Sequence, residues 1–315
     1  MGAGAAYIWL VVGFILLIKG ADFFVDGSSS VAKKFKVPSL IIGMTIVAMG
    51  TSLPECSVSI NAAIAGSNGL AISNAVGSNI FNLMVVCGVC ALFCPLAVDE
   101  STLKKEFPFS VLVAIILLVL GGVGMLLGHI DGVVLIVIFA GFLFWMVQSA
   151  KKARAEGKNV EDEEYEILPG WKCLFYIIFG SIAIAIGGEL VVDSASKIAA
   201  QFGMSDTLIG LTIVAFGTSL PELVTSIVAA RKNEVDMALG NVIGSNIFNI
   251  LFVLGIASAI SPITFKMENI IDIIVLVVMS AIVWGFAWTK KKLVRMEGAA
   301  MLVMYAGYVV YICMR

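Results

Sequence analysis

Long apolar segments, separated by short polar ones, recur along the whole chain. Each is long enough to cross roughly 30 Å of hydrocarbon as an α-helix, and none has the alternating apolar and polar residues of a β-barrel strand. A helix also satisfies its own backbone groups, as lipid requires. The pattern therefore predicts an all-α integral membrane protein with ten transmembrane helices, near residues 5–31, 38–65, 70–96, 106–128, 130–150, 171–201, 205–230, 235–260, 268–289 and 297–314.

The composition agrees with this class. Of all residues, 60% are hydrophobic and 13% charged, and the mean hydropathy is +1.04, which excludes an ordinary soluble domain. The first apolar stretch carries Lys19, Asp22 and Asp26 and lacks both a basic leader and a clear cleavage site. We therefore expect a retained helix rather than a signal peptide, with these charges paired locally or reaching the membrane surface.

Lysine and arginine are distributed unequally between the two ends of the predicted helices. One face of the membrane receives the basic residues that follow the first, third, fifth, seventh and ninth spans, whereas the other receives only Lys266 and Arg315. By the positive-inside rule the basic face is cytoplasmic, which places both termini outside the cytoplasm. We expect a multi-pass protein of the plasma (inner) membrane.

An internal duplication divides the chain. Adding 167 to each residue number superposes Gly20–Asn82 on Gly187–Asn249 without a gap, and GTSLPE and GSNIFN recur at matching positions. Each copy contributes five spans, an odd number, so the second copy enters the membrane from the opposite side and the repeats are inverted. The predicted organisation is a first five-helix repeat at 1–150 with its motif at 43–82, a solvated cytoplasmic linker at 151–169, and a second repeat at 170–315 with its motif at 210–249.

Each hexapeptide places a proline inside an apolar span. Pro54 cannot donate to the carbonyl of Gly50, nor Pro221 to that of Gly217, so each helix is interrupted and carbonyl oxygens are freed within the bilayer. This is tolerable only where a cavity, water or an ion satisfies them. Interrupted helices at matching positions of inverted repeats are typical of transporters that bind their substrate near the membrane midplane.

The side chains around each break supply further oxygen ligands. Thr51 and Glu55 lie four residues apart and share a helical face, and Thr218 and Glu222 repeat that spacing. Hard cations prefer oxygen, and calcium takes about six to eight such ligands; sodium accepts the same set. One calcium ion or two or three sodium ions would neutralise the two glutamates. The neighbouring candidates are Ser52, Ser219, Ser78, Asn82, Ser245 and Asn249.

Some residues of these segments have an alternative role in packing. Gly43, Gly210 and Asn74 are typical of close helix contacts. Asn79 and Asn246 lie one residue past the inward serine, and we expect a structural role for them. A packing role for the two glutamates is a weaker interpretation, because it would have to arise twice beside matching helix breaks.

The paired G-T-S-L-P-E and G-S-N-I-F-N motifs in two inverted halves resemble the alpha repeats of the cation/calcium exchanger superfamily, and more narrowly the prokaryotic sodium/calcium antiporters. The resemblance covers nearly the whole chain. It implies exchange of several sodium ions for one calcium ion by alternating access, with the first and sixth helices sliding across the other eight. The metal ligands that it implies are the carbonyls of Ala48 and Ala215 and the side chains of Thr51, Ser52, Glu55, Ser78, Asn82, Thr218, Ser219, Glu222, Ser245 and Asn249.

One position departs from that pattern. Asn249 stands where many exchangers of this group, including potassium-dependent ones, carry aspartate. A neutral asparagine leaves two fixed carboxylates, so we expect transport that is independent of potassium. A proton-coupled calcium or cation exchanger stays an alternative because a desolvated glutamate can titrate near neutral pH, and a passive cation channel is a weaker one.

Other chemistry has little support in the sequence. The single histidine, His129, falls at a predicted turn, and there is no H-E-x-x-H motif. Cys87, Cys90 and Cys94 lie at helical spacing without a histidine or a fourth thiol, so we interpret them as small apolar side chains. We expect a transporter rather than an enzyme, with calcium, sodium and the lipid bilayer as partners, and with no cofactor and no nucleic acid.

Overall fold

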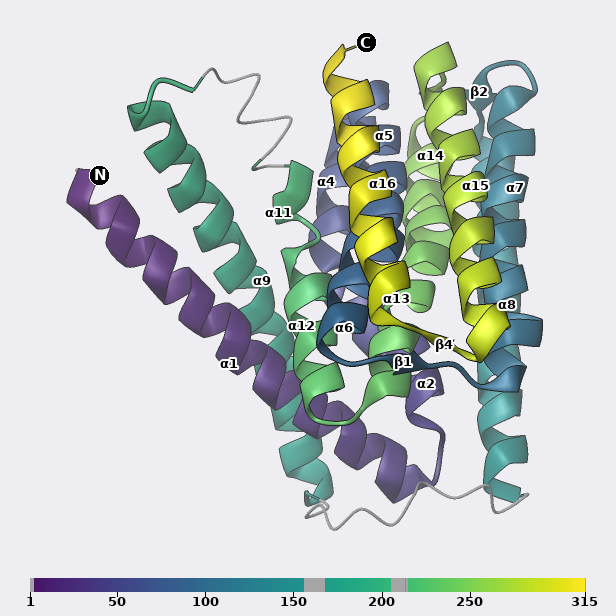
Figure 1. Ribbon diagram of the computed structural model, residues 1–315. Coiled ribbons are helices and arrows are strands. Elements are labelled where there is room, and N and C mark those ends of the chain that lie inside the picture. Colours follow the sequence, from purple (N-terminus) through teal and green to yellow (C-terminus); the bar gives the residue numbers. More distant parts are fainter. Residues whose placement is uncertain (1–2, 156–167, 205–212, 214, 315) are drawn as a thin grey trace.

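The computed structural model describes residues 3–155, 168–204, 213 and 215–314. These residues fold into helices, several with a π-helical turn, and four two-residue strands (Figure 1). The elements are α1 (Ala3–Phe35), α2 (Ser39–Ile42), η1 (Gly43–Val47), α3 (Ala48–Thr51), α4 (Leu53–Ile64), α5 (Asn68–Phe81), η2 (Asn82–Val86), α6 (Cys87–Phe93), β1 (Leu96–Ala97), η3 (Thr102–Glu106), α7 (Phe107–Gly122), β2 (Leu126–Leu127), α8 (His129–Ala155), α9 (Gly170–Gln201), α11 (Ala215–Gly217), α12 (Leu220–Arg231), α13 (Val235–Phe248), η5 (Asn249–Leu254), α14 (Gly255–Ile260), β3 (Ile263–Thr264), α15 (Met267–Lys290), β4 (Lys292–Leu293) and α16 (Arg295–Met314).

In the described part of the chain, 7 helices are long and apolar enough to cross a membrane. An eighth span is added if the bent pair Ser39–Thr51 and Leu53–Ile64, which meet at 51°, is one crossing. Of the two further predicted spans, α7 is 16 residues long, and the span near 205–230 falls partly outside the described residues. The all-helical membrane class is confirmed, and ten helices in inverted repeats stay a prediction.

Corresponding segments of the two halves form corresponding elements. The bounds of α4, α5 and β1 become those of α12, α13 and β3 when 167 is added to each residue number. Residues with a positive φ angle correspond as well: Gly66 (73°) with Asn233 (62°), and Lys36 (53°) with Gly203 (81°). The strands then join the halves, because β1 pairs with β4 and β2 with β3, both antiparallel.

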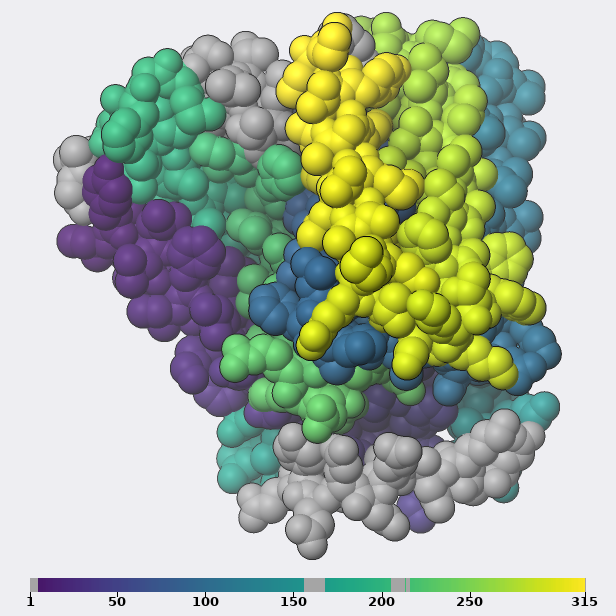
Figure 2. Space-filling view, in the orientation of Figure 1, coloured from purple at the N-terminus to yellow at the C-terminus, as the bar shows by residue number. Residues whose placement is uncertain are grey.

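The helices α1 and α9 form a layer of their own, which crosses the remaining bundle obliquely at one side of the molecule (Figures 1 and 2). Glycines at intervals of seven residues bring the two backbones together. A Cβ atom on Gly20 would lie 2.9 Å from the backbone nitrogen of Ile184, and one on Gly187 would lie 2.7 Å from that of Leu17. Larger residues at these positions would push the helices apart, so the pair is held by close backbone contact.

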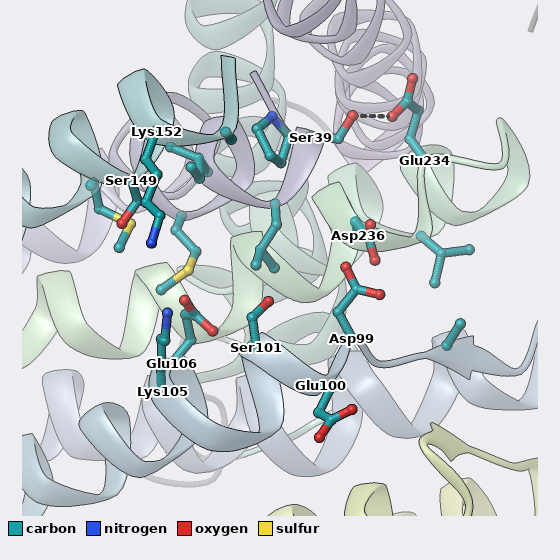
Figure 3. A pocket seen from close by; sticks show the side chains of 18 of the residues that line it. Ser39, Asp99, Glu100, Ser101, Lys105, Glu106, Ser149, Lys152, Glu234 and Asp236 are labelled. Atoms are coloured by element: carbon teal, nitrogen blue, oxygen red, sulfur yellow. Dashed lines mark hydrogen bonds between the residues drawn. The ribbon is translucent and has the colours of Figure 1, made fainter. Parts of the chain in front are cut away.

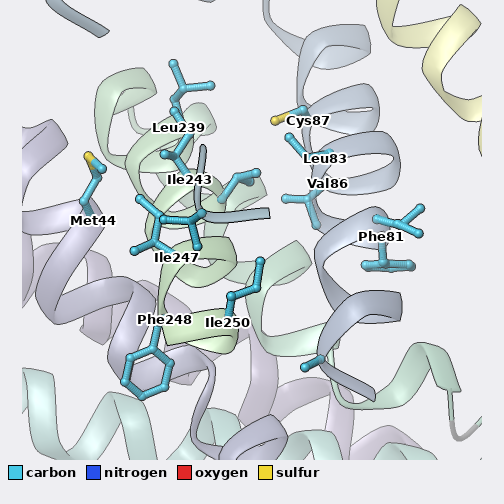
Figure 4. Close-up of a cluster of buried hydrophobic side chains, with 14 of the residues drawn as sticks. Met44, Phe81, Leu83, Val86, Cys87, Leu239, Ile243, Ile247, Phe248 and Ile250 are labelled. Carbon is cyan, nitrogen blue, oxygen red and sulfur yellow. The ribbon is translucent and has the colours of Figure 1, made fainter. Parts of the chain in front are cut away.

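The centre of the remaining bundle is built from α5 and α13 with the π-helical turns that follow them. Their apolar side chains form a continuous buried cluster with α2, η1 and α6 (Figure 4). The close packing includes Gly43, where a Cβ atom would lie 2.5 Å from the carbonyl oxygen of Met237. The predicted packing role of Gly43 is therefore confirmed, whereas Gly210 lies outside the described residues.

Candidate functional site

The first helix break lies where the proline predicts it. The segment α3 ends at Thr51 and α4 begins at Leu53, with Pro54 in its first turn, and Ser52 between them has φ −85° and ψ 14°. The second break repeats this geometry, since Ser219 before α12 has φ −93° and ψ 6°. Each break therefore places a serine and a glutamate at the start of a new helix, inside the bundle.

The carbonyl of Gly50, which Pro54 cannot reach as a donor, has a different partner. The hydroxyl of Ser181 in α9 donates to it at 3.4 Å. The position equivalent to Ser181 in the other half is Phe14, which has no hydroxyl. The two breaks are thus alike in backbone, and the side chain of Phe14 cannot repeat at the second break the bond that Ser181 makes at the first.

The two glutamates are fully buried, and each is bonded by a serine of the other half. Ser219 donates to Oε1 of Glu55 at 3.1 Å, and Ser52 donates to Oε1 of Glu222 at 2.6 Å. Ser78 of α5 adds a longer bond to Glu55 at 3.4 Å. Because these bonds cross between the halves, the two carboxyl groups belong to one site.

Ten buried side-chain atoms find no hydrogen-bond partner in the described part of the chain, and five of them are oxygens of the glutamates and of other candidate ligands. Unpaired buried polar atoms are uncommon and call for an explanation such as a bound ion. All five belong to the candidate set, and all can accept a metal ion: Oε2 of Glu55, Oε2 of Glu222, Oδ1 of Asn82, Oδ1 of Asn249 and Oγ of Ser245.

A reciprocal pair of asparagines joins the two halves beside this set. Asn79 donates to the carbonyl of Asn246 at 3.0 Å, and Asn246 donates to that of Asn79 at 3.3 Å. The side chains also hold the next asparagines, because Asn249 donates to Oδ1 of Asn79 at 3.1 Å and Asn82 to Oδ1 of Asn246 at 3.4 Å. With their nitrogens so engaged, Asn82 and Asn249 leave their oxygens free for a ligand.

The remaining candidates lie on the same segments. Thr51 is fully buried at the end of α3 and Thr218 is half-buried before α12. Ala48 is buried at the first position of α3, and Ala215 begins α11. Among the ion pairs of the described residues, none includes Glu55 or Glu222.

Comparison with known proteins gives this arrangement a family. The family model described as "Sodium/calcium exchanger protein" matches residues 5–148 and 172–314. The chain is a member of the sodium/calcium exchanger family.

Relatives and solved structures agree with this assignment. The exchanger is 32% identical to sodium/calcium exchanger MaX1 of Methanosarcina acetivorans over 96% of this chain and 97% of that one. It is 36% identical to the inner membrane protein YrbG of Escherichia coli over 87% of each. The sodium-calcium exchanger NCX_Mj, soaked with 2.5 mM Na⁺ and 0.1 mM Ca²⁺, has the same fold, with a TM-score of 0.85 and 36% identity over 97% of this chain and 98% of that one.

A polar cavity of about 910 Å³ lies in this exchanger at the end that carries the basic segments (Figure 3). Acidic and basic side chains line it together, including Asp99, Glu106, Asp236, Lys105 and Lys152. Neither Glu55 nor Glu222 is among the residues that line it. The buried glutamates and this cavity are therefore separate features of the molecule.

Sequence reasoning missed the part played by Asn74 and Asn241. Asn74 was expected to be a packing residue, and the structure shows it bonded to the carbonyl of Glu55 at 3.1 Å. Asn241 makes the same bond to Glu222 at 3.4 Å. A signal was available, since both asparagines lie four residues before a candidate serine and correspond under the shift of 167.

Proposed function

We propose that this sodium/calcium exchanger moves several sodium ions against one calcium ion by alternating access, through the site between Glu55 and Glu222, with ten helices arranged as two inverted repeats. The unpartnered buried oxygens of Glu55, Glu222, Asn82, Asn249 and Ser245 carry this proposal. Leaving such atoms unsatisfied costs roughly 1–3 kcal/mol each, more for a charged group. A hard cation removes that cost, because all five are ligands that it prefers.

The proposed ligand set divides equally between the halves. The first half supplies the carbonyl of Ala48 and the second that of Ala215, and the other ligands are the ten side chains predicted from the motifs. Two carboxylates balance one divalent ion or two monovalent ions. Sodium and calcium therefore compete for shared ligands, and loading with one favours release of the other.

The moving part of the cycle is the pair formed by α1 and α9. Its internal contact is a close glycine seam, whereas the rest of the bundle is joined across the halves by two strand pairs. The contacts of this pair with the helix breaks, such as the bond from Ser181 to Gly50, can be exchanged as it slides. A change at either break is then transmitted to the ion ligands beside it.

The proposed orientation places both termini outside the cytoplasm. In Figure 1 the marked N- and C-termini lie towards one end of the molecule, and the last turn of α1, which contains Lys33 and Lys34, lies at the other. A concentration of lysine and arginine on one side supports a cytoplasmic position for that side. A tag at the C-terminus that is accessible to protease in right-side-out vesicles, and not in inverted ones, tests this.

Transport is proposed to be independent of potassium. Asn249 is neutral, and its amide nitrogen is held by Asn79, so the site has two fixed carboxylates. We expect calcium uptake into proteoliposomes at a fixed sodium gradient and clamped voltage to be unchanged by potassium. Stimulation by potassium would contradict the prediction.

The deciding experiment is radioactive calcium uptake into proteoliposomes loaded with sodium and diluted into sodium-free buffer. We expect uptake that requires internal sodium and falls about a hundredfold or more in Glu55→Gln and in Glu222→Gln, because each change removes one of the two charges that balance calcium. Uptake driven by a pH gradient without sodium would support proton coupling instead. Calcium flux that needs no counter-ion would indicate a channel.

A further inference from the structure

Two asparagines outside the proposed ligand set lie directly behind it. Asn74 of α5 and Asn241 of α13 are equivalent positions in the two halves, each one helical turn before a candidate serine. Asn241 is fully buried and Asn74 is half-buried. Neither is in the set that the motifs predict.

The amide nitrogen of each asparagine faces the glutamate turn of its own half. In the second half, Nδ2 of Asn241 donates to the carbonyl of Glu222 at 3.4 Å and to the hydroxyl of Ser226 at 2.9 Å. In the first half, Nδ2 of Asn74 donates to the carbonyl of Glu55 at 3.1 Å and to the hydroxyl of Ser59, the residue equivalent to Ser226, at 2.9 Å. A backbone carbonyl can only accept, so the nitrogen must face it and the amide oxygen must point the other way.

The amide oxygen of each asparagine faces a threonine of the other half. Oδ1 of Asn241 lies 3.1 Å from the hydroxyl of Thr51, and Oδ1 of Asn74 lies 3.4 Å from that of Thr218. An amide oxygen cannot donate, so in each pair the threonine supplies its single hydrogen. The lone pairs of that hydroxyl are then left for another partner.

Thr51 has other acceptors within reach: the carbonyls of Val47 at 3.2 Å and Ala48 at 3.3 Å, and the carboxylate of Glu222. Asn241 offers a shorter contact than either carbonyl, at 3.1 Å. When the hydroxyl donates to Asn241, the carbonyl of Ala48 keeps a lone pair that would otherwise be occupied. Ala48 is itself a proposed ligand, so one hydrogen bond frees two oxygen atoms for the cation.

We propose that Asn74 and Asn241 are positioning residues for cation binding. The amide oxygen of each asparagine accepts the hydroxyl hydrogen of the threonine in the other half and so keeps that hydrogen away from the ion. Its amide nitrogen holds the backbone carbonyl of the glutamate in the same half as the asparagine. Each asparagine therefore links a threonine of one half to a glutamate of the other. The inference rests on the proposed function and deepens it, because it assigns how Thr51 and Thr218 come to act as ligands for a hard cation. We expect the larger effect from Asn241, because its bond to Thr51 is shorter than that of Asn74 to Thr218 and because Asn241 is completely buried.

The test is calorimetric calcium titration of the purified protein in detergent, with apparent KM and kcat from proteoliposomes alongside. We expect Asn241→Leu to weaken calcium affinity by about ten- to hundredfold, the range for outer partners of metal ligands. Asn74→Leu has a smaller effect in the same direction. Asn61→Leu is the matched control, because Asn61 is exposed on α4 and bonds only within its own helix, to Ser57.

A double-mutant cycle separates positioning from packing. If Asn241 acts through Thr51, combining Asn241→Leu with Thr51→Val causes no further loss of calcium affinity. The double variant then binds calcium as tightly as whichever single variant has the lower affinity. Thr51→Val combined with Asn74→Leu is the control, because these two residues do not contact each other. In that double variant we expect the two losses of calcium affinity to multiply. Should Asn241→Leu fail to elute as a folded protein, Asn241→Ala, which also removes both the acceptor and the donors, takes its place with the same expectation.

Opposite results overturn the inference. Calcium affinity of Asn241→Leu within about threefold of the parent, or losses that multiply in the Thr51 pair, would show that the asparagine only fills space. Failure of the proposed function is a separate outcome. In that case the unmodified protein itself shows no sodium-dependent calcium uptake.

Discussion

The hairpins formed by α4 with α5 and by α12 with α13 have the same lengths and the same helix break, yet their tips differ. The first tip is Ala65, Gly66 and Ser67, whereas the second is Lys232, Asn233 and Glu234. The backbone turn is the same, because Gly66 and Asn233 both adopt a positive φ. The duplication has thus preserved the turn geometry and changed the charge that it presents.

The charged tip holds the end of α1. Lys232 donates to Asp26 at 2.7 Å and lies 3.5 Å from Asp22. Glu234 accepts hydrogen bonds from Ser29 and from Ser39, the latter at 2.8 Å. These contacts fix the last turns of α1 and the start of α2 to the hairpin of the other half, and the tip at Ala65–Ser67 has no charged side chain with which to do the same. The pair formed by α1 and α9 is therefore anchored unequally at its two ends.

The glycine seam is the symmetric part of the contact, so equivalent substitutions there should have equal and large effects. We expect Gly20→Leu and Gly187→Leu each to reduce folded yield and exchange by tenfold or more, since overpacking against backbone costs about 1–3 kcal/mol or more. The measurement is detergent-solubilised yield by size exclusion, followed by uptake. Gly141→Leu is the control, because Gly141 is exposed on α8 with open space around it. Tolerance of one seam variant alone would refute the symmetry.

The charged tip is where the halves should respond differently. Lys232→Met and Glu234→Gln remove contacts that Ser67→Ala cannot, so hydrogen exchange at the end of α1 should rise in the first two variants only. Partly exposed ion pairs contribute about 1 kcal/mol at most, which limits the increase to roughly fivefold. Mass-spectrometric exchange of residues 29–39 measures it, and an equal increase in Ser67→Ala would contradict the comparison. Lys197→Met is a second control, because its pair with Asp193 is local and exposed.

The smallest expected effect is at Ser181. Its bond to the carbonyl of Gly50 is long, at 3.4 Å, so we expect a net contribution at the low end of the range for hydrogen bonds, about 0.5 kcal/mol. We expect Ser181→Ala to change turnover by less than about threefold while leaving calcium affinity unchanged. Phe14→Ala at the equivalent position is the matched control, because it removes no side-chain hydrogen bond. A loss of calcium affinity in Ser181→Ala would place this serine in the ion site instead.

The parts of the fold that the sequence predicts are those that local rules control. The breaks at Pro54 and Pro221 follow from the chemistry of proline, and the apolar segments follow from the bilayer. The matching of α4 with α12 follows from the repeat. Each of these features depends only on neighbouring residues in the sequence or on the offset of 167 residues between the two repeats.

Contacts between remote segments could not be predicted in this way. Asp26 was expected to be paired locally or to reach the surface, and it bonds Lys232, which is 206 residues away. Asn74 was interpreted as packing because nothing local distinguishes a small polar residue between helices from one that bonds a glutamate carbonyl. Which hydroxyl meets which carboxylate, as in Ser219 with Glu55, is decided by the crossing of the halves. That crossing carries no signal in a single sequence.

The pairing of strands between the halves, β1 with β4 and β2 with β3, bears on how the two halves could assemble. The two pairs are equivalent to within a residue, since each joins the first short strand of one half to the second short strand of the other. The glycine contacts of α1 with α9 are reciprocal in the same sense. A contact made twice by the same two patches is that of an isologous dimer. If the halves are two inverted five-helix repeats, as we propose, a single five-helix chain inserted in both orientations would make these strand and glycine contacts with a second copy of itself. Covalent linkage of the halves would then be an addition to the interface and not a condition for it.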